Sequence, residues 1–327
     1  MTAINSNKKT MILVTGACGQ IGTELVKALR EKHGRDKVVA TDRHFASDSL
    51  QETGPYFKLD VLDKYELENL VCSLGITQIY HLAAVLSASG ENNPLATWNL
   101  NMESLLNVLE IARQEKLDKV FWPSSIAVFG PSSPRINCPQ HTVTEPTTVY
   151  GISKNAGEHW CMYYFEKFGL DVRSLRYPGL ISYSAKAGGG TTDYAVDIFH
   201  QAVAQGEYVC FLREDTLLPM LYMPDAIRAT LELMDAPAEQ ITVRTSYNLA
   251  GLSFTPAELA KAIQTELPGF KISYQPDFRQ TIADSWPGSI NDSEARNHWN
   301  WEPAYNLNAM TADMLKHIGP NTSEKNG

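Results

Sequence analysis

Short apolar runs alternate with segments of helical periodicity over the first half of the chain. Six runs have the length and composition of strands: 11–14, 37–41, 56–59, 78–81, 119–122 and 171–175. Between them, apolar residues recur every three or four positions, as Ile21, Leu25 and Ala28 do. Strands that alternate with helices predict βαβ units, and right-handed crossovers place helices on both faces of a parallel sheet. The chain is therefore predicted to have an α/β fold with a doubly wound, Rossmann-type parallel sheet.

The regular alternation of predicted strands and helices ends after residue 178. Three glycines at 188–190 indicate a loop, and the later pattern predicts helices over 194–204, 223–234 and 255–266 and a short strand at 246–249. We expect a Rossmann domain over 10–178 together with about 220–250, and a smaller, less regular substrate-binding lobe over about 179–219 and 251–318. The polar ends, 1–9 and 319–327, are expected to be flexible.

Composition and charge exclude several classes of protein. The chain has 327 residues, of which 43% are hydrophobic and 20% charged, and this excludes an intrinsically disordered protein. The 37 Asp and Glu residues outnumber the 28 Lys and Arg residues, and the net charge of −9 argues against nucleic-acid binding. No apolar stretch approaches the roughly 18–20 residues that a membrane span needs.

The cysteines and the first residues predict a cytoplasmic protein without a metal. The five cysteines form no CxxC motif, so neither a zinc ribbon nor a redox motif is indicated. The polar segment Met1–Lys9 lacks both the apolar core of a signal peptide and the Arg-rich pattern of a transit peptide.

The first predicted strand runs into a glycine-rich turn. Gly16, Gly19 and Gly22 are spaced GxxGxxG, directly before a predicted helix. In such a turn the first glycine permits a tight bend, the second lets the backbone approach a pyrophosphate, and the third lets helix and strand pack closely. The helix N-terminus then offers unpaired N–H groups to phosphates. This position in a βαβ unit predicts a dinucleotide site.

Two carboxylates follow at the ends of the next strands. Asp42 ends the second strand, where a carboxylate accepts hydrogen bonds from the ribose hydroxyls and repels a 2′-phosphate. This favours NAD over NADP, although Arg43 beside it could hold that phosphate. Asp60 ends the third strand and could either reach the adenine amino group or cap the helix ahead of Asp63.

The candidate catalytic residues are Tyr150, Lys154 and Ser125. Tyr150 and Lys154 stand four apart on one face at the start of a predicted helix. Ser124 and Ser125 close the fifth strand, at the sheet edge where ligands bind in such folds. A tyrosine with a pKa of about 10 is a weak base, but a nearby ammonium and an oxidised nicotinamide both favour the phenolate. Tyr150 could then remove a hydroxyl proton that Ser125 holds in line. YxxxK by itself could equally mark a solvated helix face.

Five strings carry a resemblance to a known family. They are TGACGQIG at 15–22, HLAA at 81–84, SSIAVFG at 124–130, YGISK at 150–154 and RYPG at 176–179. In these strings the chain resembles the extended short-chain dehydrogenases/reductases, which include many nucleotide-sugar epimerases and dehydratases. The resemblance implies the class of chemistry and NAD as cofactor, and it leaves the substrate open.

Further strings resemble one branch of that family, the short-chain-type L-threonine 3-dehydrogenases. These strings are LSASGENNP at 86–94, GGGTTDYA at 188–195, LPMLYMPDAIRAT at 218–230, PDFRQTIADSWPGSINDS at 276–293 and ARNHWNW at 295–301. This resemblance implies oxidation of the L-threonine β-hydroxyl to 2-amino-3-ketobutyrate, with reduction of NAD and without zinc. It also implies a homodimer formed through helices near 101–114 and 151–168.

The resemblance assigns roles residue by residue. Tyr150 matches the catalytic base, Lys154 its partner and Ser125 the hydroxyl position, while His81 matches a structural position. The substrate residues that it implies are Ser87, Ser125, Tyr150, Thr191, Thr192 and Trp286. Trp286 could instead be a core residue of the smaller lobe. The cofactor residues expected from the motifs and the resemblance are Gly16, Gly19, Gln20, Ile21, Gly22, Asp42, Arg43, Asp60, Val61, Leu82, Ala83, Ala84, Asn99, Tyr150, Lys154 and Tyr177.

Two other functions remain open at this point. A nucleotide-sugar epimerase of the same fold would use NAD without net turnover, and a regulator that senses NAD would need no catalysis. Such regulators usually lack the tyrosine and lysine pair, which this chain retains as Tyr150 and Lys154.

Overall fold

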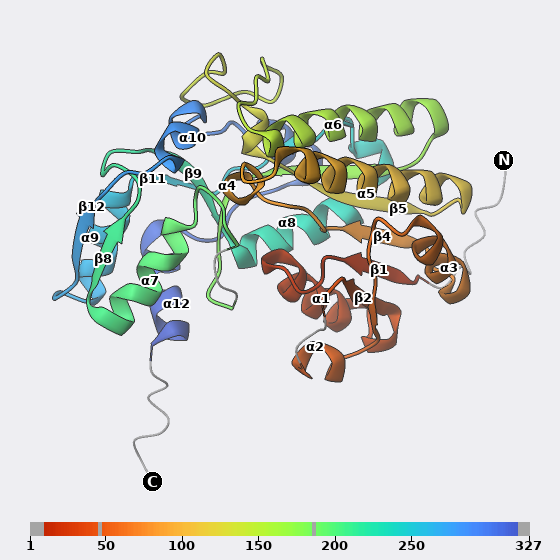
Figure 1. The fold of residues 1–327 in the computed structure, drawn as a ribbon, viewed down its shortest axis with the longest axis horizontal. Helices are drawn as coiled ribbons and strands as arrows, with labels where there is room; N and C mark the ends of the chain where they lie inside the picture. Colours follow the sequence, from red (N-terminus) through yellow and green to blue (C-terminus); the bar gives the residue numbers. More distant parts are fainter. Residues whose placement is uncertain (1–9, 45–47, 185–187, 320–327) are drawn as a thin grey trace, which may run out of the picture.

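A computed structural model describes residues 10–44, 48–184 and 188–319 of the chain. Of the ends predicted to be flexible, 1–9 and 319–327, all but Gly319 lie outside the described residues. The largest sheet has seven parallel strands in the order β10-β6-β5-β4-β1-β2-β3 (Figure 1). The strands are β1 (Ile12–Thr15), β2 (Val38–Asp42), β3 (Tyr56–Lys58), β4 (Gln78–His81), β5 (Lys119–Ser125), β6 (Val172–Tyr177) and β10 (Tyr247–Asn248). The predicted Rossmann-type sheet is confirmed.

Helices cover both faces of this sheet, because its strands are apolar on both sides. In β1, Ile12 and Val14 belong to one buried cluster and Leu13 to another, as the alternation of side chains along a strand requires. The first cluster includes residues of α1 (Gln20–His33) and α8 (Met223–Asp235). The second includes residues of α3 (Lys64–Leu74), α5 (Pro94–Gln114) and α6 (Val149–Phe168). Short helices complete the connections: η1 (Arg35–Lys37), α2 (Asp48–Glu52), α4 (Ser87–Gly90), η2 (Ile126–Val128) and η3 (Ala238–Gln240).

Apart from α8 and β10, most of the chain beyond β6 forms two small sheets away from the large sheet (Figure 1). With Cys138 and the residues of η2, this part of the chain also forms a third buried cluster. One sheet joins β7 (Gly179–Ile181), β9 (Leu218–Tyr222) and β11 (Leu252–Phe254), and the other joins β8 (Glu207–Cys210) and β12 (Lys271–Tyr274). The helices here are α7 (Tyr194–Gln205), α9 (Pro256–Glu266), α10 (Arg279–Ser285) and α12 (Leu307–Ile318), whereas α11 (Ser293–Trp299) packs in the first cluster through Ala295 and Trp299. Thr255 caps α9 and forms a capping box with Glu258.

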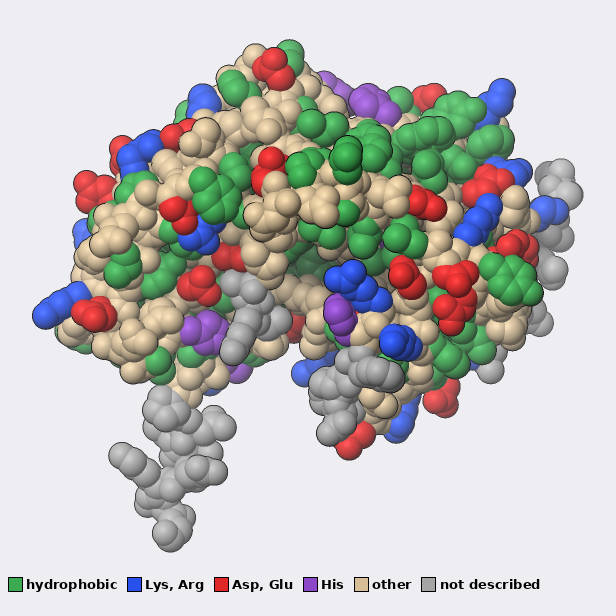
Figure 2. Space-filling model, in the orientation of Figure 1, with side chains coloured by type: hydrophobic (Ala, Val, Ile, Leu, Met, Phe, Trp, Pro, Cys, Tyr) green, Lys and Arg blue, Asp and Glu red, His purple; other side chains and the backbone are tan. Residues whose placement is uncertain are grey.

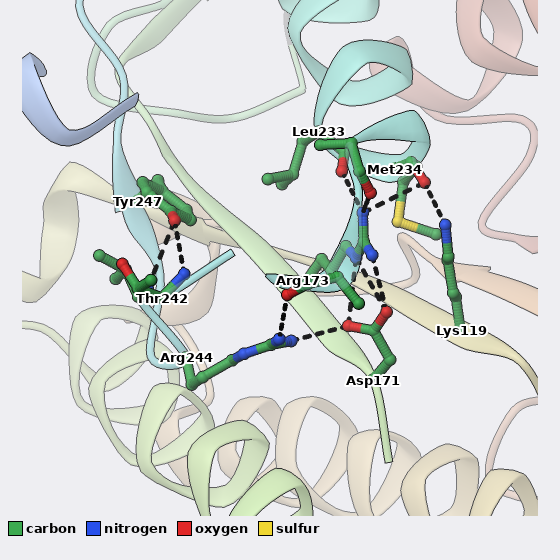
Figure 3. A network of polar contacts seen from close by, with 11 residues as sticks. Lys119, Asp171, Arg173, Leu233, Met234, Thr242, Arg244 and Tyr247 are labelled. Atoms are coloured by element: carbon green, nitrogen blue, oxygen red, sulfur yellow. Dashed lines mark hydrogen bonds and ion pairs between the residues drawn. The ribbon is translucent and has the colours of Figure 1, made fainter. Parts of the chain in front are cut away.

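A buried charge network fastens the end of α8 to the start of β6 (Figure 3). Arg173 donates to the carbonyl oxygens of Leu233 at 2.6 Å and Ala236 at 2.7 Å, which lie where the helix has no further N–H partners. Asp171 accepts from Arg173 and Arg244, both at 2.7 Å. The network lies at the N-terminal end of the strand, so it supports the sheet from the side opposite the strand ends that carry Ser125.

In the part of the chain that the structure describes, no helix has the length and apolar character needed to cross a membrane.

Candidate active site

The glycine turn packs against the end of β4. Gly16 has φ +72°, and a Cβ on it would lie 2.7 Å from the backbone nitrogen of Ala83. A Cβ on Gly22 would lie 2.3 Å from the carbonyl oxygen of Gly16, so a side chain there would push α1 off the turn. Gly19 has only that carbonyl within reach, at 3.3 Å, and its outer side is open. The backbone is thus exposed where a pyrophosphate would approach, and the turn fits the dinucleotide that the motif predicts.

A cleft opens beside this turn and gathers most of the predicted cofactor residues. Figure 2 shows the surface hollowed between the region of α7 and α12 and the region of α1. The predicted residues that line the cleft come from the ends of four neighbouring strands: Gly16, Gly19, Asp42, Arg43, Asp60, Val61, Leu82, Ala83 and Ala84. Cys18, His44, Leu59, Val85 and Leu100 also line it. The carboxyl ends of parallel strands meet at this edge, which explains why residues distant in sequence share one site.

The carboxylate of Asp42 is held in a fixed orientation. It accepts hydrogen bonds from the backbone N–H groups of Cys18 and His44, each at 3.1 Å. Arg43 is exposed at the rim, and its Nε donates to the His44 ring at 3.1 Å. The cleft therefore presents a fixed carboxylate, with the exposed Arg43 at its rim.

Asp63, and not Asp60, caps α3. The Asp63 side chain accepts from the backbone N–H of Glu66, as an N-cap does. Asp60 accepts from the N–H of Leu62 at 3.0 Å and lines the cleft with its neighbour Val61. Of the two interpretations of Asp60, the geometry favours the one in which the carboxylate faces the cofactor.

Seven predicted cofactor residues do not line this cleft: Tyr150 and Lys154, at the start of α6, and five others. Gln20, Ile21 and Gly22 form the first turn of α1, next to the cleft. Asn99 is exposed on α5. Tyr177 is buried in the core beside Phe121, and its hydroxyl contacts Thr230.

The start of α6 is fixed against the end of β5. Thr148 caps the helix by accepting from the N–H of Gly151 at 3.0 Å. A Cβ on Gly151 would lie 2.1 Å from the carbonyl oxygen of Ala127, so only glycine allows this approach. The close packing brings Tyr150, the preceding residue, to Ser125 at the strand end, and the two side chains form a hydrogen bond.

Lys154 lies buried one turn along α6 from Tyr150. Its amine donates to the carbonyl oxygen of Pro123 at 2.6 Å and lies 4.4 Å from the ring centroid of Trp122 and 5.6 Å from that of Tyr150. Burial lowers the pKa of Lys154 to about 7. Burial raises the pKa of Tyr150 to about 12, although the hydrogen bond with Ser125 opposes the rise. The predicted catalytic trio is therefore assembled in one place, with Lys154 buried and Tyr150 and Ser125 half-buried.

His81 is a structural residue, as expected. One ring nitrogen contacts the Thr15 hydroxyl at 2.8 Å and the other contacts Ser104 at 3.1 Å. Burial and the nearby Lys154 lower its pKa to about 3, so it links β4, β1 and α5 as a neutral ring.

The predicted substrate residues come from separate elements. Ser87, in α4, lies 3.3 Å from the hydroxyl of Thr191, and both are buried. Thr192 lies next to Gly179, where a Cβ would be 2.7 Å from the Thr192 Cβ. Trp286 is buried in the cluster against which Tyr150 packs. Trp286 is thus a core residue of the smaller lobe, and its predicted place as a wall of the substrate pocket stays a prediction.

Two polar residues that the sequence analysis passed over also belong to this region. Asn101 bonds both backbone groups of Val85, at 2.8 and 3.2 Å, and donates to the Ser153 hydroxyl at 3.2 Å. It thereby joins the cleft to α6, because Ser153 in turn donates to the carbonyl of Tyr150. Asp193 accepts from the N–H groups of Gly189 and Gly190, next to Thr191 and Thr192. The sequence held one hint of each role, because Asn101 is two positions from the predicted Asn99 and Asp193 is next to the predicted Thr192.

Among the described residues, no group of three or more His, Cys, Asp or Glu side chains is placed to hold a metal ion.

Comparison with known proteins places the chain in a family. The sequence matches the model of the NAD dependent epimerase/dehydratase family over residues 12–250. An uncharacterised epimerase/dehydratase of Staphylococcus saprophyticus is 50% identical over 309 residues, which are 94% of this chain and 96% of that protein. The chain is therefore a member of this family and an oxidoreductase that uses NAD.

Solved structures narrow the resemblance. A GalE-like L-threonine dehydrogenase from Cupriavidus necator, in its holo form, is 57% identical and superposes with a TM-score of 0.92 over 94% of this chain and 99% of that one. A monomeric L-threonine 3-dehydrogenase from a metagenome is 49% identical, with a TM-score of 0.91 over 94% of this chain and 98% of that one. Within its family the chain is thus similar to L-threonine 3-dehydrogenases, which confirms the resemblance expected from the sequence.

Proposed function

We propose that this oxidoreductase converts the β-hydroxyl of L-threonine to the ketone of 2-amino-3-ketobutyrate while NAD is reduced. The observation that carries the proposal is the hydrogen-bonded pair of Tyr150 and Ser125, with the Lys154 amine 5.6 Å from the phenol ring. The similarity to solved threonine dehydrogenases over nearly the whole chain supports the choice of substrate. In this proposal residues 10–178, with about 220–250, bind NAD, and about 179–219 and 251–318 enclose the amino acid.

Two groups of this chain act on the substrate hydroxyl. Ser125 donates a hydrogen bond to the substrate oxygen and holds it in line with the base. Tyr150, as phenolate, takes the hydroxyl proton onto its oxygen. Bound NAD supplies the acceptor for the hydride that leaves the β-carbon. One proton and one hydride leave together, so the C–OH carbon becomes C=O and the electrons balance.

Tyr150 has to lose its phenol proton near neutral pH, and the groups around it determine how easily that proton is lost. Burial raises the pKa of Tyr150, so the phenolate needs positive charge nearby. The ammonium of Lys154 provides that charge on the same helix face. With a pKa of about 7, Lys154 is only partly protonated at neutral pH, and small changes around it change the strength of the base.

The substrate's amino-acid group meets the loop before α7. Hydroxyls of Ser87, Thr191 and Thr192 and the adjoining backbone N–H groups suit a small carboxylate. Asp193 is the carboxylate next to these threonines, and it suits the ammonium of the same substrate. Trp286 closes the apolar side, where the threonine methyl group would lie.

The test is NADH formation by the purified protein with L-threonine and NAD. We expect a steady rise in NADH absorbance, a much slower rise with NADP, because Asp42 repels the 2′-phosphate, and none with UDP-sugars. Absence of an NADH signal with L-threonine would refute the proposal. Conversion of a UDP-sugar without net NADH would instead support the epimerase chemistry found elsewhere in the family.

We also propose that two copies pair through α5 and α6. Figure 2 shows hydrophobic side chains gathered over these helices. The exposed apolar residues there are Leu95, Trp98, Ile152, Trp160, Tyr163 and Phe168. An exposed apolar patch on a helix that already packs inward through Cys161 and Tyr164 is normally covered by a partner. A second copy of the chain supplies such a cover.

A further inference from the structure

A buried ion pair lies one helical turn beyond Lys154. Glu158 belongs to the same face of α6, and its partner Arg176 comes from the neighbouring end of β6. Their side chains are 2% and 6% exposed. Neither residue contacts the NAD cleft, and the chemistry proposed above makes no use of either.

Both oxygens of the Glu158 carboxylate accept hydrogen bonds from fixed donors. One oxygen accepts from the Ser124 hydroxyl at 2.6 Å and from Arg176 Nε at 2.8 Å, and the other accepts from the Arg176 terminal nitrogen at 2.7 Å. Ser124 immediately precedes Ser125, so the pair is anchored to the strand end that carries the substrate-binding hydroxyl.

Arg176 is itself held from three sides. It donates to the carbonyl of Gln140 at 2.9 Å and to the side chain of Asn248 at 3.1 Å, and it lies over the ring of Phe129 at 5.3 Å. Its pKa is raised, since the carboxylate of Glu158 outweighs burial, so the guanidinium stays charged. A buried ion pair of this kind gains little stability over apolar residues of the same size.

The charged and titratable groups that face Lys154 are few. On its own helix they are Tyr150, Glu158 and the thiol of Cys161, and from β4 the neutral ring of His81. Arg176 faces Lys154 only from behind the Glu158 carboxylate. The other neighbours of the amine, Pro123 and Trp122, supply a carbonyl and an indole face. Burial lowers the pKa of this amine, and Cys161 and Glu158 oppose that effect. Burial raises the pKa of the Cys161 thiol, which leaves Glu158 as the carboxylate on this helix face, bound to Ser124 beside the Pro123 carbonyl that accepts from the amine.

We propose that Glu158 is a positioning residue for the reaction: held by Ser124 and Arg176, its carboxylate keeps the Lys154 amine protonated, and Lys154 then keeps Tyr150 effective as a base. The inference rests on the proposed function for its catalytic consequence. Its electrostatic part concerns this chain alone and is measurable without substrate.

The primary experiment is a titration of Lys154 by NMR in protein labelled at the lysine Cε, with its resonance assigned by its loss in Lys154→Met. Removing an opposite charge one helical turn away should lower such a pKa by about 1 unit. We therefore expect Glu158→Gln to lower the pKa of Lys154 by about that amount. Glu158→Asp retains the charge and should restore most of the wild-type value. Glu110→Gln, which removes another carboxylate paired with an arginine, should leave Lys154 unchanged.

Glu158→Gln leaves Arg176 without its counter-ion and can fail to fold for that reason. The double variant Glu158→Gln/Arg176→Gln leaves no buried charge unpaired, so the titration is also carried out on it. A fall in the Lys154 pKa in either variant supports the proposal. An unchanged Lys154 titration in a folded variant overturns it, whatever substrate the enzyme uses.

The second readout is the dependence of kcat on pH with L-threonine. Without a charged Lys154 the phenol is harder to ionise, so the ascending limb of the profile should move to higher pH by about 1 unit, and kcat at pH 7 should fall roughly tenfold. A purely structural role for Glu158 would lower activity equally at every pH. If the Lys154 titration shifts but the pH profile of kcat does not, the catalytic half of the proposal is overturned. If the wild-type protein is inactive on L-threonine, that result counts against the proposed function alone.

Discussion

Gly151 and Ala127 are in such close contact that a Cβ on the glycine would lie 2.1 Å from the Ala127 carbonyl oxygen. The contact sets the distance between the first turn of α6 and the end of β5. Tyr150 precedes the glycine and Ser125 lies two residues before the alanine, so the same contact brings the two hydroxyls together. The site therefore depends on a backbone approach as much as on the side chains that it carries.

Substitution of Gly151 by alanine tests this dependence. The added methyl group forces α6 away from η2 and separates Tyr150 from Ser125, so kcat should fall at least tenfold while the affinity for NAD, measured by fluorescence titration, changes little. Gly269→Ala is the matched control, because a Cβ there meets nothing within 4 Å. Wild-type kcat in Gly151→Ala would show that this approach does not position the base.

Asn101 is expected to matter for the cofactor, and Asn99 is not. Asn101→Ala leaves both backbone groups of Val85 without their partner, which should cost about 1–3 kcal/mol of stability and weaken NAD binding. Asn99→Ala alters an exposed side chain and serves as the control. Urea unfolding and NAD titration measure both effects. If Asn99→Ala weakens NAD binding more than Asn101→Ala does, the roles are reversed.

The network around Asp171 predicts a loss of stability in acid. Burial by itself raises the pKa of Asp171, but the hydrogen bonds from Arg173 and Arg244 outweigh it and the pKa is lowered. A carboxyl group whose pKa is lowered on folding stabilises the protein above its unfolded pKa of about 3.9, and this contribution is lost as the pH falls through the folded value.

Asp171→Asn should therefore destabilise the protein at pH 7 by about 3 kcal/mol, because it leaves the Arg173 guanidinium buried without its carboxylate. The difference from wild type, measured by urea unfolding, should shrink below pH 4. Asp235→Asn, which alters an exposed partner of Lys32, should change stability by less than about 0.5 kcal/mol. A difference for Asp171→Asn that stays constant from pH 7 to pH 3 would contradict this account.

Charge placed on α6 tests the proposed pairing of two copies. Trp160 and Tyr163 are partly exposed and contact each other with ring centroids 5.7 Å apart. Trp160→Glu should convert a dimer to a monomer in analytical ultracentrifugation without unfolding the chain, since a buried charge in an interface is strongly disfavoured. Phe278→Glu is the control on an exposed aromatic residue of another surface. A wild-type protein that is already monomeric would refute the pairing.

The sequence predicts the large sheet well for a physical reason. Strands buried on both faces are continuous apolar runs, so β1, β2, β4 and the first half of β5 stand out against the helices between them. The small sheets did not stand out. β7 and β11 have three residues each, and β8 and β12 alternate with exposed positions, so their pairing depends on partners distant in the sequence.

Some residues of the candidate site could likewise be predicted from the sequence, and others could not. Tyr150, Lys154, Ser125 and the glycine turn were predictable, because the spacing of their motifs fixes their place on an element. Asn101 and Glu158 act through tertiary partners, a backbone segment and an arginine on another strand, which no local pattern reveals.

The most direct test of the account is the rate of L-threonine-dependent NADH formation by the wild type and by Tyr150→Phe at the same saturation with NAD. The phenylalanine keeps the ring and removes the oxygen that accepts the proton, so turnover should fall to background while NAD binding stays within about twofold of wild type. Tyr163→Phe, an exposed position on the same helix, should keep full activity. Undiminished NADH formation by Tyr150→Phe would contradict the assignment of the base and with it the proposed reaction.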